Sequence, residues 1–296
     1  MAGHVIVTGA SGKIGSKLAE TLLERGVKVK VVGRSEERLS GLSAKGADPV
    51  AADLHDESAL LRAFSGATGV FAMVPPDYAA EDMLDRQARV VDALAGALGK
   101  AGAPPTVALS SGGADRPSGT GPIVTLHRFE KTLSAVPGLP LVILRPAYFM
   151  ENHLGSLAVI KAHGILGGTV APDRPFSQIA TRDIAAFAAD LLAVPSFTGR
   201  STRPLLGPRD VSLAGAAAIL GRSIGRPDLP YVRLEESALR QGLIDAGFAR
   251  AVAGLFIEMN KALGQGLIDQ PRTPESTTPT TLEMFAADTF APAFRG

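Results

Sequence analysis

Three glycines form the first group of residues that could do chemistry. Gly9, Gly12 and Gly15 lie within TGASGKIG, directly after a short apolar run and at the start of a segment with helical spacing. Such a turn brings backbone N–H groups and the positive end of a helix dipole close to a phosphate. The pattern predicts a site for a nucleotide pyrophosphate, and the alternative is a glycine turn made only for packing.

Arg34 is the second candidate, and it bears on which dinucleotide binds. It stands nineteen residues after the last glycine of the turn, where chains that bind NAD carry Asp or Glu for the ribose 2′-hydroxyl. A guanidinium there, with Ser35 and Arg38 in reach, pairs with a 2′-phosphate, and a bond of roughly 1.5–3 kcal/mol gives about ten- to a hundredfold selectivity. We expect NADP(H) to be preferred; the alternatives are that Arg34 is solvated or pairs with Glu36 or Glu37.

Asp53 and Leu54 follow a third, weaker apolar run and are placed to contact the adenine edge, with an N-cap role for Asp53 as the alternative.

The sequence motifs of other enzyme classes do not match this chain. A Walker A loop needs Ser or Thr after Gly-Lys, but Ile14 follows Lys13. The Gly-x-Ser-x-Gly pattern fails around Ser11 and Ser110, and no His-Glu-x-x-His motif occurs. The chain has no cysteine and therefore no thiolate ligand or thiol nucleophile. A P-loop NTPase, a serine hydrolase and a zinc enzyme are disfavoured, and no metal site is expected.

The composition is that of a globular protein. Of 296 residues, 46% are hydrophobic and 20% charged, and the formal net charge is +1 with no basic cluster that would favour nucleic acid. The first residues do not resemble a signal peptide, and no apolar run approaches the roughly 20 residues of a membrane span. We expect a cytoplasmic protein that acts on a small molecule, with neither nucleic acid nor a membrane as partner.

The elements that must position these residues alternate along the first half of the chain. β-branched apolar runs predict strands, and segments with helical spacing predict the helices between them. The strands are expected at 4–8, 27–32, 48–52, 69–74, 106–110 and 141–145, and the helices at 13–25, 35–44, 57–64, 79–100 and 122–136. This alternation predicts an α/β fold with a doubly wound parallel sheet, whose carboxyl edge would hold the ligands.

The pattern changes in the second half of the chain. Residues 147–175 are rich in Gly and Pro, short strands are predicted at 176–180 and 203–206, and Asp183 is expected to cap a helix through Val194. From about 211 onward the spacing is mainly helical. We expect a nucleotide-binding Rossmann domain over 1–149, to which 176–206 returns, and a smaller, mainly helical cap on the substrate side from 150–175 and 207–296.

The chain resembles the NmrA-like branch of the atypical short-chain dehydrogenase/reductases. The resemblance lies in TGASGKIG, VVGRS, ADLHD, VFAMVPP, ALSSGGAD, LVILRPAYFMEN, TRDIAA and LLGPRDVS, which occur in this order over about residues 1–221. It implies a Rossmann domain with a small cap and NADP(H) as cofactor. It also implies either a reductase of quinones or related acceptors, or a regulatory protein that senses the dinucleotide.

By position, the resemblance assigns residues to each part of the cofactor. The pyrophosphate falls on Gly9, Ser11, Gly12, Lys13, Ile14 and Gly15. Arg34, with Arg38 beside it, is assigned to the 2′-phosphate, and Asp53 and Leu54 are assigned to the adenine. The residues assigned to the ribose are Met73, Val74 and Pro75. The nicotinamide end falls on Ser110, Ser111, Pro146, Ala147, Tyr148 and Phe149.

The proton relay of the wider superfamily, Tyr-x-x-x-Lys, does not occur at its usual spacing. No tyrosine has Lys four residues later, whereas His127 stands four before Lys131, so that both share one helix face. An imidazole can donate a proton near neutral pH, and the candidate catalytic residues are His127, Lys131 and Tyr148. The candidate walls of a flat apolar pocket, each with a place in the core as the alternative, are Tyr148, Phe149, His153, Phe176 and Phe248.

The missing relay changes which acceptor is favoured. A reduced ketone is a strongly basic alkoxide that needs a proton donor, whereas a reduced quinone is a resonance-stabilised anion that water can protonate. We predict an oxidoreductase that passes hydride from NADPH to a quinone-like or other activated carbonyl or enone acceptor, mainly by proximity and orientation. The alternative is a non-catalytic NADP(H) sensor with a regulatory protein partner, and the sequence leaves a homodimer open.

Overall fold

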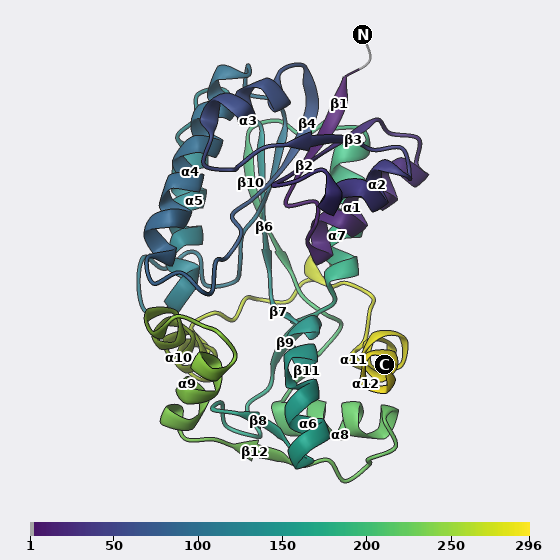
Figure 1. Cartoon of the computed structure of the whole chain (residues 1–296), viewed down its shortest axis with the longest axis vertical. Helices are drawn as coiled ribbons and strands as arrows, with labels where there is room; N and C mark the ends of the chain where they lie inside the picture. Colours follow the sequence, from purple (N-terminus) through teal and green to yellow (C-terminus); the bar gives the residue numbers. More distant parts are fainter. Residues whose placement is uncertain (1–2) are drawn as a thin grey trace.

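A seven-stranded parallel sheet forms the centre of the computed structural model, which describes residues 3–296 (Figure 1). In chain order its strands are β1 (His4–Thr8), β2 (Val29–Gly33), β3 (Asp48–Ala51), β4 (Ala67–Met73), β5 (Thr106–Leu109), β6 (Leu141–Pro146) and β10 (Arg200–Leu205). Their spatial order is β10-β6-β5-β4-β1-β2-β3, and every neighbouring pair is parallel. The winding reverses between β1 and β4, and the predicted doubly wound α/β fold is confirmed.

Helices cover both faces of this sheet because its strands are apolar on both sides. The helices are α1 (Lys13–Glu24), η1 (Glu37–Leu39), α2 (Ser40–Ser43), α3 (Glu57–Phe64), α4 (Met83–Lys100), η2 (Gly121–Ile123), α5 (Val124–Ser134) and α7 (Thr181–Ala193). Along β1, Val5 and Val7 pack with α1 and α7, whereas Ile6 packs with α3, α4 and α5. These two cores hold β1, β4, β5 and β6 so that all four end at one edge of the sheet.

The remaining elements lie beyond the carboxyl edge of the sheet, as Figure 1 shows. Their strands form two small sheets, made of β7 (Tyr148–Phe149), β9 (Phe176–Ile179) and β11 (Asp210–Val211), and of β8 (Leu166–Gly168) and β12 (Tyr231–Arg233). The helices are η3 (Met150–Ser156), α6 (Leu157–His163), α8 (Leu213–Ser223), α9 (Glu236–Asp245), α10 (Arg250–Gly264), η4 (Pro274–Ser276), α11 (Leu282–Phe285), η5 (Ala286–Phe290) and α12 (Ala291–Arg295). An apolar cluster that includes Phe285 and Phe290 joins α6, α8, α11 and η5.

Two local expectations differ from the structure. The Gly- and Pro-rich residues 147–175 contain η3, α6 and β8, short elements whose few buried positions give little periodic signal. The helix expected from Asp183 begins at Thr181, whose backbone N–H donates to the Glu151 carboxylate (3.0 Å), whereas Asp183 accepts from the backbone and hydroxyl of Thr280. No helix within residues 3–296 has both the length and the apolar character needed to cross a membrane.

Candidate active site

The glycine turn joins β1 to α1 at the carboxyl edge, and its backbone is shaped for close approach. Gly9 has a φ of +63°, and a Cβ there would lie 2.5 Å from the Met73 sulfur. The Gly12 N–H donates to the Gly9 carbonyl (2.9 Å) and closes the turn. Because Gly12 is also the N-cap and has no side chain, the first N–H groups of α1 stay free for a phosphate. Of the residues assigned to the pyrophosphate, Ser11, Gly12 and Lys13 are exposed, Gly9 is half-buried, and Ile14 and Gly15 are buried.

Gly15→Ala is expected to disrupt this turn. An added Cβ would lie 2.4 Å from the Gly9 carbonyl oxygen, a contact that only a backbone shift can relieve. We expect the free energy of unfolding to fall by about 1–3 kcal/mol, the usual cost of overpacking, and dinucleotide binding to weaken. Chemical denaturation and a binding titration measure both effects. Gly41→Ala, where a Cβ meets nothing within 4 Å, is the control and should bind normally; normal binding by Gly15→Ala would contradict a tightly constrained turn.

A buried threonine joins the two central strands at the turn. Thr8, at the end of β1, donates its hydroxyl to the Phe71 carbonyl (3.0 Å) and accepts from the Met73 N–H (3.1 Å). β1 and β4 therefore end at the same level. The predicted ribose residues Met73, Val74 and Pro75 follow directly, with Val74 buried and the other two half-buried.

The predicted adenine end lies beyond β2 and β3. Arg34 follows β2 and is exposed, Arg38 is exposed in η1, and Asp53 follows β3. Hydrogen bonds from the backbone and the ring of His55 hold the pKa of Asp53 below its usual range, and the positive charge of Arg34 adds to the effect. Arg34 and Asp53 therefore lie near each other at the edge, and Leu54 is buried. The N-cap of α3 is Asp56, so the N-cap role considered for Asp53 is wrong.

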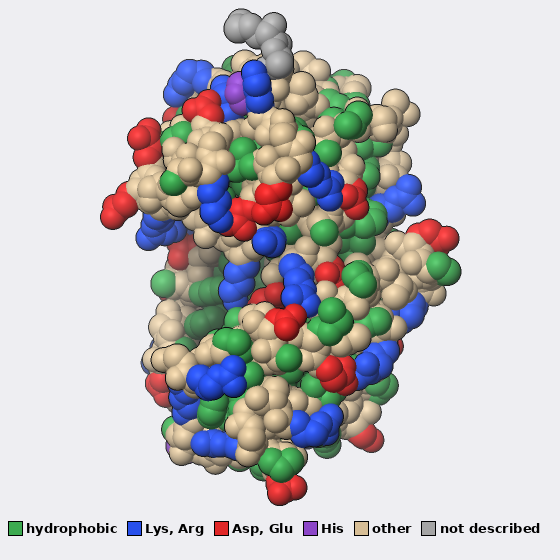
Figure 2. Space-filling model, turned by 90° about the vertical axis from the view of Figure 1, so that its right-hand side faces the viewer, with side chains coloured by type: hydrophobic (Ala, Val, Ile, Leu, Met, Phe, Trp, Pro, Cys, Tyr) green, Lys and Arg blue, Asp and Glu red, His purple; other side chains and the backbone are tan. Residues whose placement is uncertain are grey.

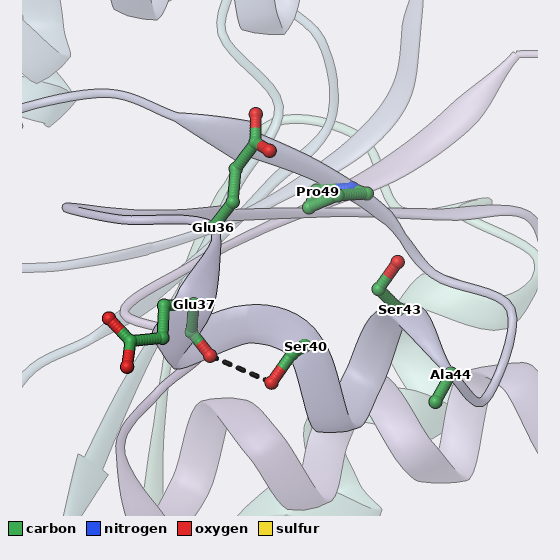
Figure 3. Close-up of a pocket in the computed structure, with 6 residues that line it drawn as sticks. All are labelled: Glu36, Glu37, Ser40, Ser43, Ala44 and Pro49. Carbon is green, nitrogen blue, oxygen red and sulfur yellow. Dashed lines mark hydrogen bonds between the residues drawn. The ribbon is translucent and has the colours of Figure 1, made fainter.

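A surface cavity of about 420 Å³ lies beside η1, α2 and β3 (Figure 3). Its lining residues are Glu36, Glu37, Ser40, Ser43, Ala44 and Pro49. The Ser40 hydroxyl donates to the Glu37 carbonyl (2.8 Å), and the two carboxylates point in different directions. A wall with two carboxylates and no lysine or arginine does not suit a phosphate, which leaves Arg34, at the start of the same turn, as the better partner.

Glu130, an acid that the sequence analysis did not single out, forms hydrogen bonds with two residues at the predicted nicotinamide end. Glu130 of α5 is buried, accepts a hydrogen bond from the Ser110 hydroxyl (2.5 Å), and binds Arg145 of β6 through both carboxylate oxygens. The hydrogen bonds to Glu130 raise the pKa of Arg145. A signal for this acid exists in the sequence, because an arginine within the apolar run LVILRP needs a buried partner.

The other residues assigned to the nicotinamide end adjoin this group. Ser111 donates its hydroxyl to the Gly112 carbonyl (2.9 Å), and Gly112 in turn donates its N–H to the Pro146 carbonyl (3.0 Å). Ala147, which is half-buried, follows and donates its N–H to the Leu205 carbonyl of β10 (2.9 Å). The ends of β5, β6 and β10 are thus held together at the predicted nicotinamide position.

The chain after α10 crosses the same edge. Gln270 donates its amide to the Arg145 carbonyl (2.9 Å). Side chains in place of Gly112 and Gly113 would meet Ile268 at 2.8 and 2.5 Å, so these glycines let the crossing segment approach the end of β5. No local sequence motif predicts this contact, because 125 residues separate Gln270 from Arg145.

His127, Lys131 and Tyr148 are not joined by a hydrogen bond among the described residues. His127 is half-buried on α5, with Nδ1 2.9 Å from the Ala114 carbonyl oxygen. A carbonyl only accepts, so Nδ1 carries a proton. Lys131 is exposed one turn later. The chemical roles of His127 and Lys131 stay predictions.

Tyr148 and Phe149 form β7, beyond the sheet edge. The Tyr148 ring packs edge to face on Phe176 (centroids 5.4 Å apart) and lies 5.7 Å from His153. Burial raises the pKa of Tyr148 to about 12, so its phenol keeps its proton at neutral pH. Burial also lowers the pKa of His153, whose Nε2 bonds to the Gln178 amide oxygen (2.8 Å), so this ring is neutral.

Two of the predicted walls have packing roles. Phe176 is 1% exposed and belongs to an apolar cluster with Val170 and Leu263. Phe248 stacks on Tyr78, which follows β4, with ring centroids 4.8 Å apart. This stack joins the loop after β4 to the segment before α10, and the Ala249 N–H reinforces it by donating to the Tyr78 carbonyl (2.8 Å).

A second cavity, of about 340 Å³, lies between the start of α1, η3 and α7. Its lining residues are Lys13, Ser16, Lys17, Glu151, Leu154, Thr181, Arg182 and Thr289. Two of its cations have acidic neighbours, because Lys17 lies 3.5 Å from Glu20 and Arg182 lies 3.1 Å from Asp288. Figure 2 shows lysine, arginine and acidic side chains mixed at mid-height of one face, and beside them a hollow with hydrophobic side chains. Within residues 3–296 no cluster of His, Asp and Glu could hold a metal ion.

Comparisons with known proteins agree with this geometry. Residues 9–195 match the family described as NAD(P)H-binding. The NAD(P)H azoreductase of Xenophilus azovorans is 27% identical over 257 residues, which cover 86% of this chain and 85% of the relative.

Two solved structures share the fold. The NADPH-dependent quinone oxidoreductase of Escherichia coli, in complex with NADPH, has a TM-score of 0.83 and 23% identity over 97% of this chain and 99% of its own. The triphenylmethane reductase of a Citrobacter species, in complex with NADP(H), has a TM-score of 0.81 and 18% identity over the same shares, 97% and 99%. The likeness to both extends across the sheet and the elements beyond it.

Proposed function

The chain belongs to the NAD(P)H-binding family, and on this basis we propose that it uses NADPH to reduce a quinone-like or other activated carbonyl or enone acceptor. The predicted resemblance to NmrA-like reductases is confirmed. The predicted dinucleotide cofactor is confirmed as NAD(P)H. The protein is an NAD(P)H-dependent oxidoreductase. We propose in addition that it prefers NADPH to NADH and that its acceptor is of this class.

The residues at the carboxyl edge fit a dinucleotide. The free N–H groups at the start of α1 would bind the pyrophosphate, Arg34 the 2′-phosphate, and the ends of β4, β5 and β6 the ribose and nicotinamide. Cβ atoms at Gly9 and Gly15 would overlap neighbouring protein atoms, so these two glycines keep the turn tight. At Gly12 a Cβ would meet only the Gly9 carbonyl oxygen, at 3.2 Å, so there is space beside this backbone for a pyrophosphate. When bound, the cofactor supplies a hydride from its nicotinamide ring.

The proposed class of electron acceptor follows from which side chains at the nicotinamide end have a proton to donate. Ser110 donates its only proton to Glu130, whereas the Tyr148 phenol, which burial keeps protonated, has a proton for a substrate. Full transfer of that proton would leave a buried phenolate, and the hydrogen bond with Asn152 offsets only part of the cost of burying that charge. Tyr148 therefore suits an acceptor whose reduced form is already a stabilised anion and needs only a hydrogen bond.

The names of related proteins support an acceptor of this kind. The Xenophilus relative is named for azo reduction, and the two solved structures for reduction of quinones and of triphenylmethane dyes. All three compound classes are conjugated electron acceptors. A hollow with hydrophobic side chains at mid-height of the molecule (Figure 2) suits a flat compound of the same type.

Tyr148→Phe tests the proposal. We expect kcat for reduction of a naphthoquinone by NADPH, followed through nicotinamide absorbance, to fall about three- to tenfold, the effect of one hydrogen bond. NADPH binding should not change, because the phenol is assigned to the acceptor. Tyr231→Phe is the matched control, since its hydroxyl donates to the Val170 carbonyl (2.7 Å). Equal losses in the two variants, or no quinone reduction by the wild type, would contradict the proposal.

A further inference from the structure

Glu130 and Arg145 form an ion pair buried between α5 and β6. Arg145 Nε lies 2.9 Å from Oε1 of Glu130 and Nη2 lies 2.5 Å from Oε2, and the side chains are 21% and 9% exposed, respectively. Pairs of this kind add little net stability, because both charges lose their hydration when they are buried. The pair therefore calls for a role beyond holding the helix to the strand.

The ion pair fixes the direction of the Ser110 hydrogen bond. A carboxylate paired with a guanidinium offers only acceptors, so the Ser110 hydroxyl must donate its single proton to Glu130 Oε1 (2.5 Å). The Ser110 backbone is fixed too, because its N–H donates to the Leu144 carbonyl (2.8 Å). Ser110 is thus held in one orientation, with no proton left to donate and a lone pair left to accept.

Ser110 belongs to the part of the sheet edge assigned to the nicotinamide, and it is 3% exposed, so only a group that packs directly on it can reach its oxygen. Ser110 directly follows β5, which stands between β4 and β6 in the sheet. On the nicotinamide ring, the carboxamide N–H groups are the donors that a hydroxyl oxygen can accept from. We propose that Ser110 accepts a hydrogen bond from the carboxamide of the nicotinamide, and that Glu130 and Arg145 are positioning residues that keep Ser110 an acceptor.

The contact has a consequence for the reaction. A carboxamide held by Ser110 cannot rotate freely, so the ring presents the same face to the acceptor in each turnover. This inference rests on the dinucleotide site of the proposed function, but it is independent of which acceptor is reduced.

A cofactor analogue tests the proposal directly. In the 3-acetylpyridine analogue of NADP⁺, a methyl ketone replaces the carboxamide, so the ring has no N–H to donate. We expect Ser110→Ala to weaken binding of NADP⁺ about three- to tenfold, measured by calorimetry, while binding of the analogue stays at the wild-type value. Thr106→Val is the matched control: it removes a buried hydroxyl from the other end of β5, where Thr106 donates to the Pro104 carbonyl (2.8 Å). It should change neither affinity.

The outcomes separate this inference from the proposed function. Equal loss of both ligands in Ser110→Ala would overturn the carboxamide contact and indicate a general disturbance of the site. No loss of either ligand, or no binding of NADP⁺ by the wild type, would overturn it as well. A selective loss of NADP⁺ supports the contact even if no quinone is reduced, because the measurement does not depend on turnover.

Discussion

Arg34→Glu is expected to weaken NADPH binding about ten- to a hundredfold and to leave NADH binding nearly unchanged. The substitution removes a charge-assisted hydrogen bond worth roughly 1.5–3 kcal/mol and places a carboxylate beside the 2′-phosphate that only NADPH carries. Because Arg34 is exposed, the difference between the two cofactors should shrink as added salt screens the charges. Titrations of the dissociation constants of both cofactors, at low and high salt, measure the effect.

The control for this variant is a charge reversal elsewhere. Arg62→Glu changes the net charge by the same amount on α3, which is on the other face of the sheet from α1, and should keep the wild-type ratio of NADPH to NADH affinity. A wild-type ratio in Arg34→Glu would show that this guanidinium does not contact the 2′-phosphate.

Glu130→Gln is expected to lower the free energy of unfolding by about 2–3 kcal/mol. The amide keeps the shape of the side chain but loses its charge, so Arg145 is left half-buried without a counter-ion. Removing one member of a fully buried pair costs about 3–5 kcal/mol, and the partial exposure of Arg145, together with Asp115 at 3.9 Å, reduces that cost. Chemical denaturation should show a lower midpoint with an unchanged m value.

A double variant separates stability from positioning. Glu130→Leu combined with Arg145→Met removes both charges and should recover most of the lost stability, because apolar residues can replace a buried pair at little cost. It should not recover the selective affinity for the carboxamide that we assign to Ser110. Wild-type stability of Glu130→Gln would contradict the ion pair described here.

Local patterns of apolar residues were enough to predict most of the fold. The six strands predicted up to residue 145 all occur in the central sheet. Five of them are apolar runs that are mostly buried, whereas β3 is an edge strand whose residues are exposed or half-buried. The turn at Gly9 could be predicted because its glycines are adjacent in sequence and meet a steric need. α6 was missed because Ile160 is its one buried residue, which gives no helical periodicity to detect.

The arrangement of the candidate site was less predictable, because its contacts join residues far apart in the chain. Residues assigned to the cofactor come to one edge because parallel strands all end there, which a strand pattern predicts. The partner of Arg145 could have been sought from its charge alone, but the sequence does not show that Glu130 faces it. Nor does it show that Gln270 reaches the end of β6, since that depends on how the elements after α10 pack.

The most direct test of the proposed reaction is oxidation of NADPH by a panel of acceptors. Wild-type protein saturated with NADPH is mixed with naphthoquinones, enones and simple ketones, and nicotinamide absorbance is followed through a single turnover, with a parallel binding titration. We predict that quinones oxidise the bound NADPH, more slowly when its transferred hydrogen is deuterium, and that simple ketones leave it unchanged. Tight binding of NADPH with every acceptor inert would contradict the reductase and support a protein that only senses the dinucleotide.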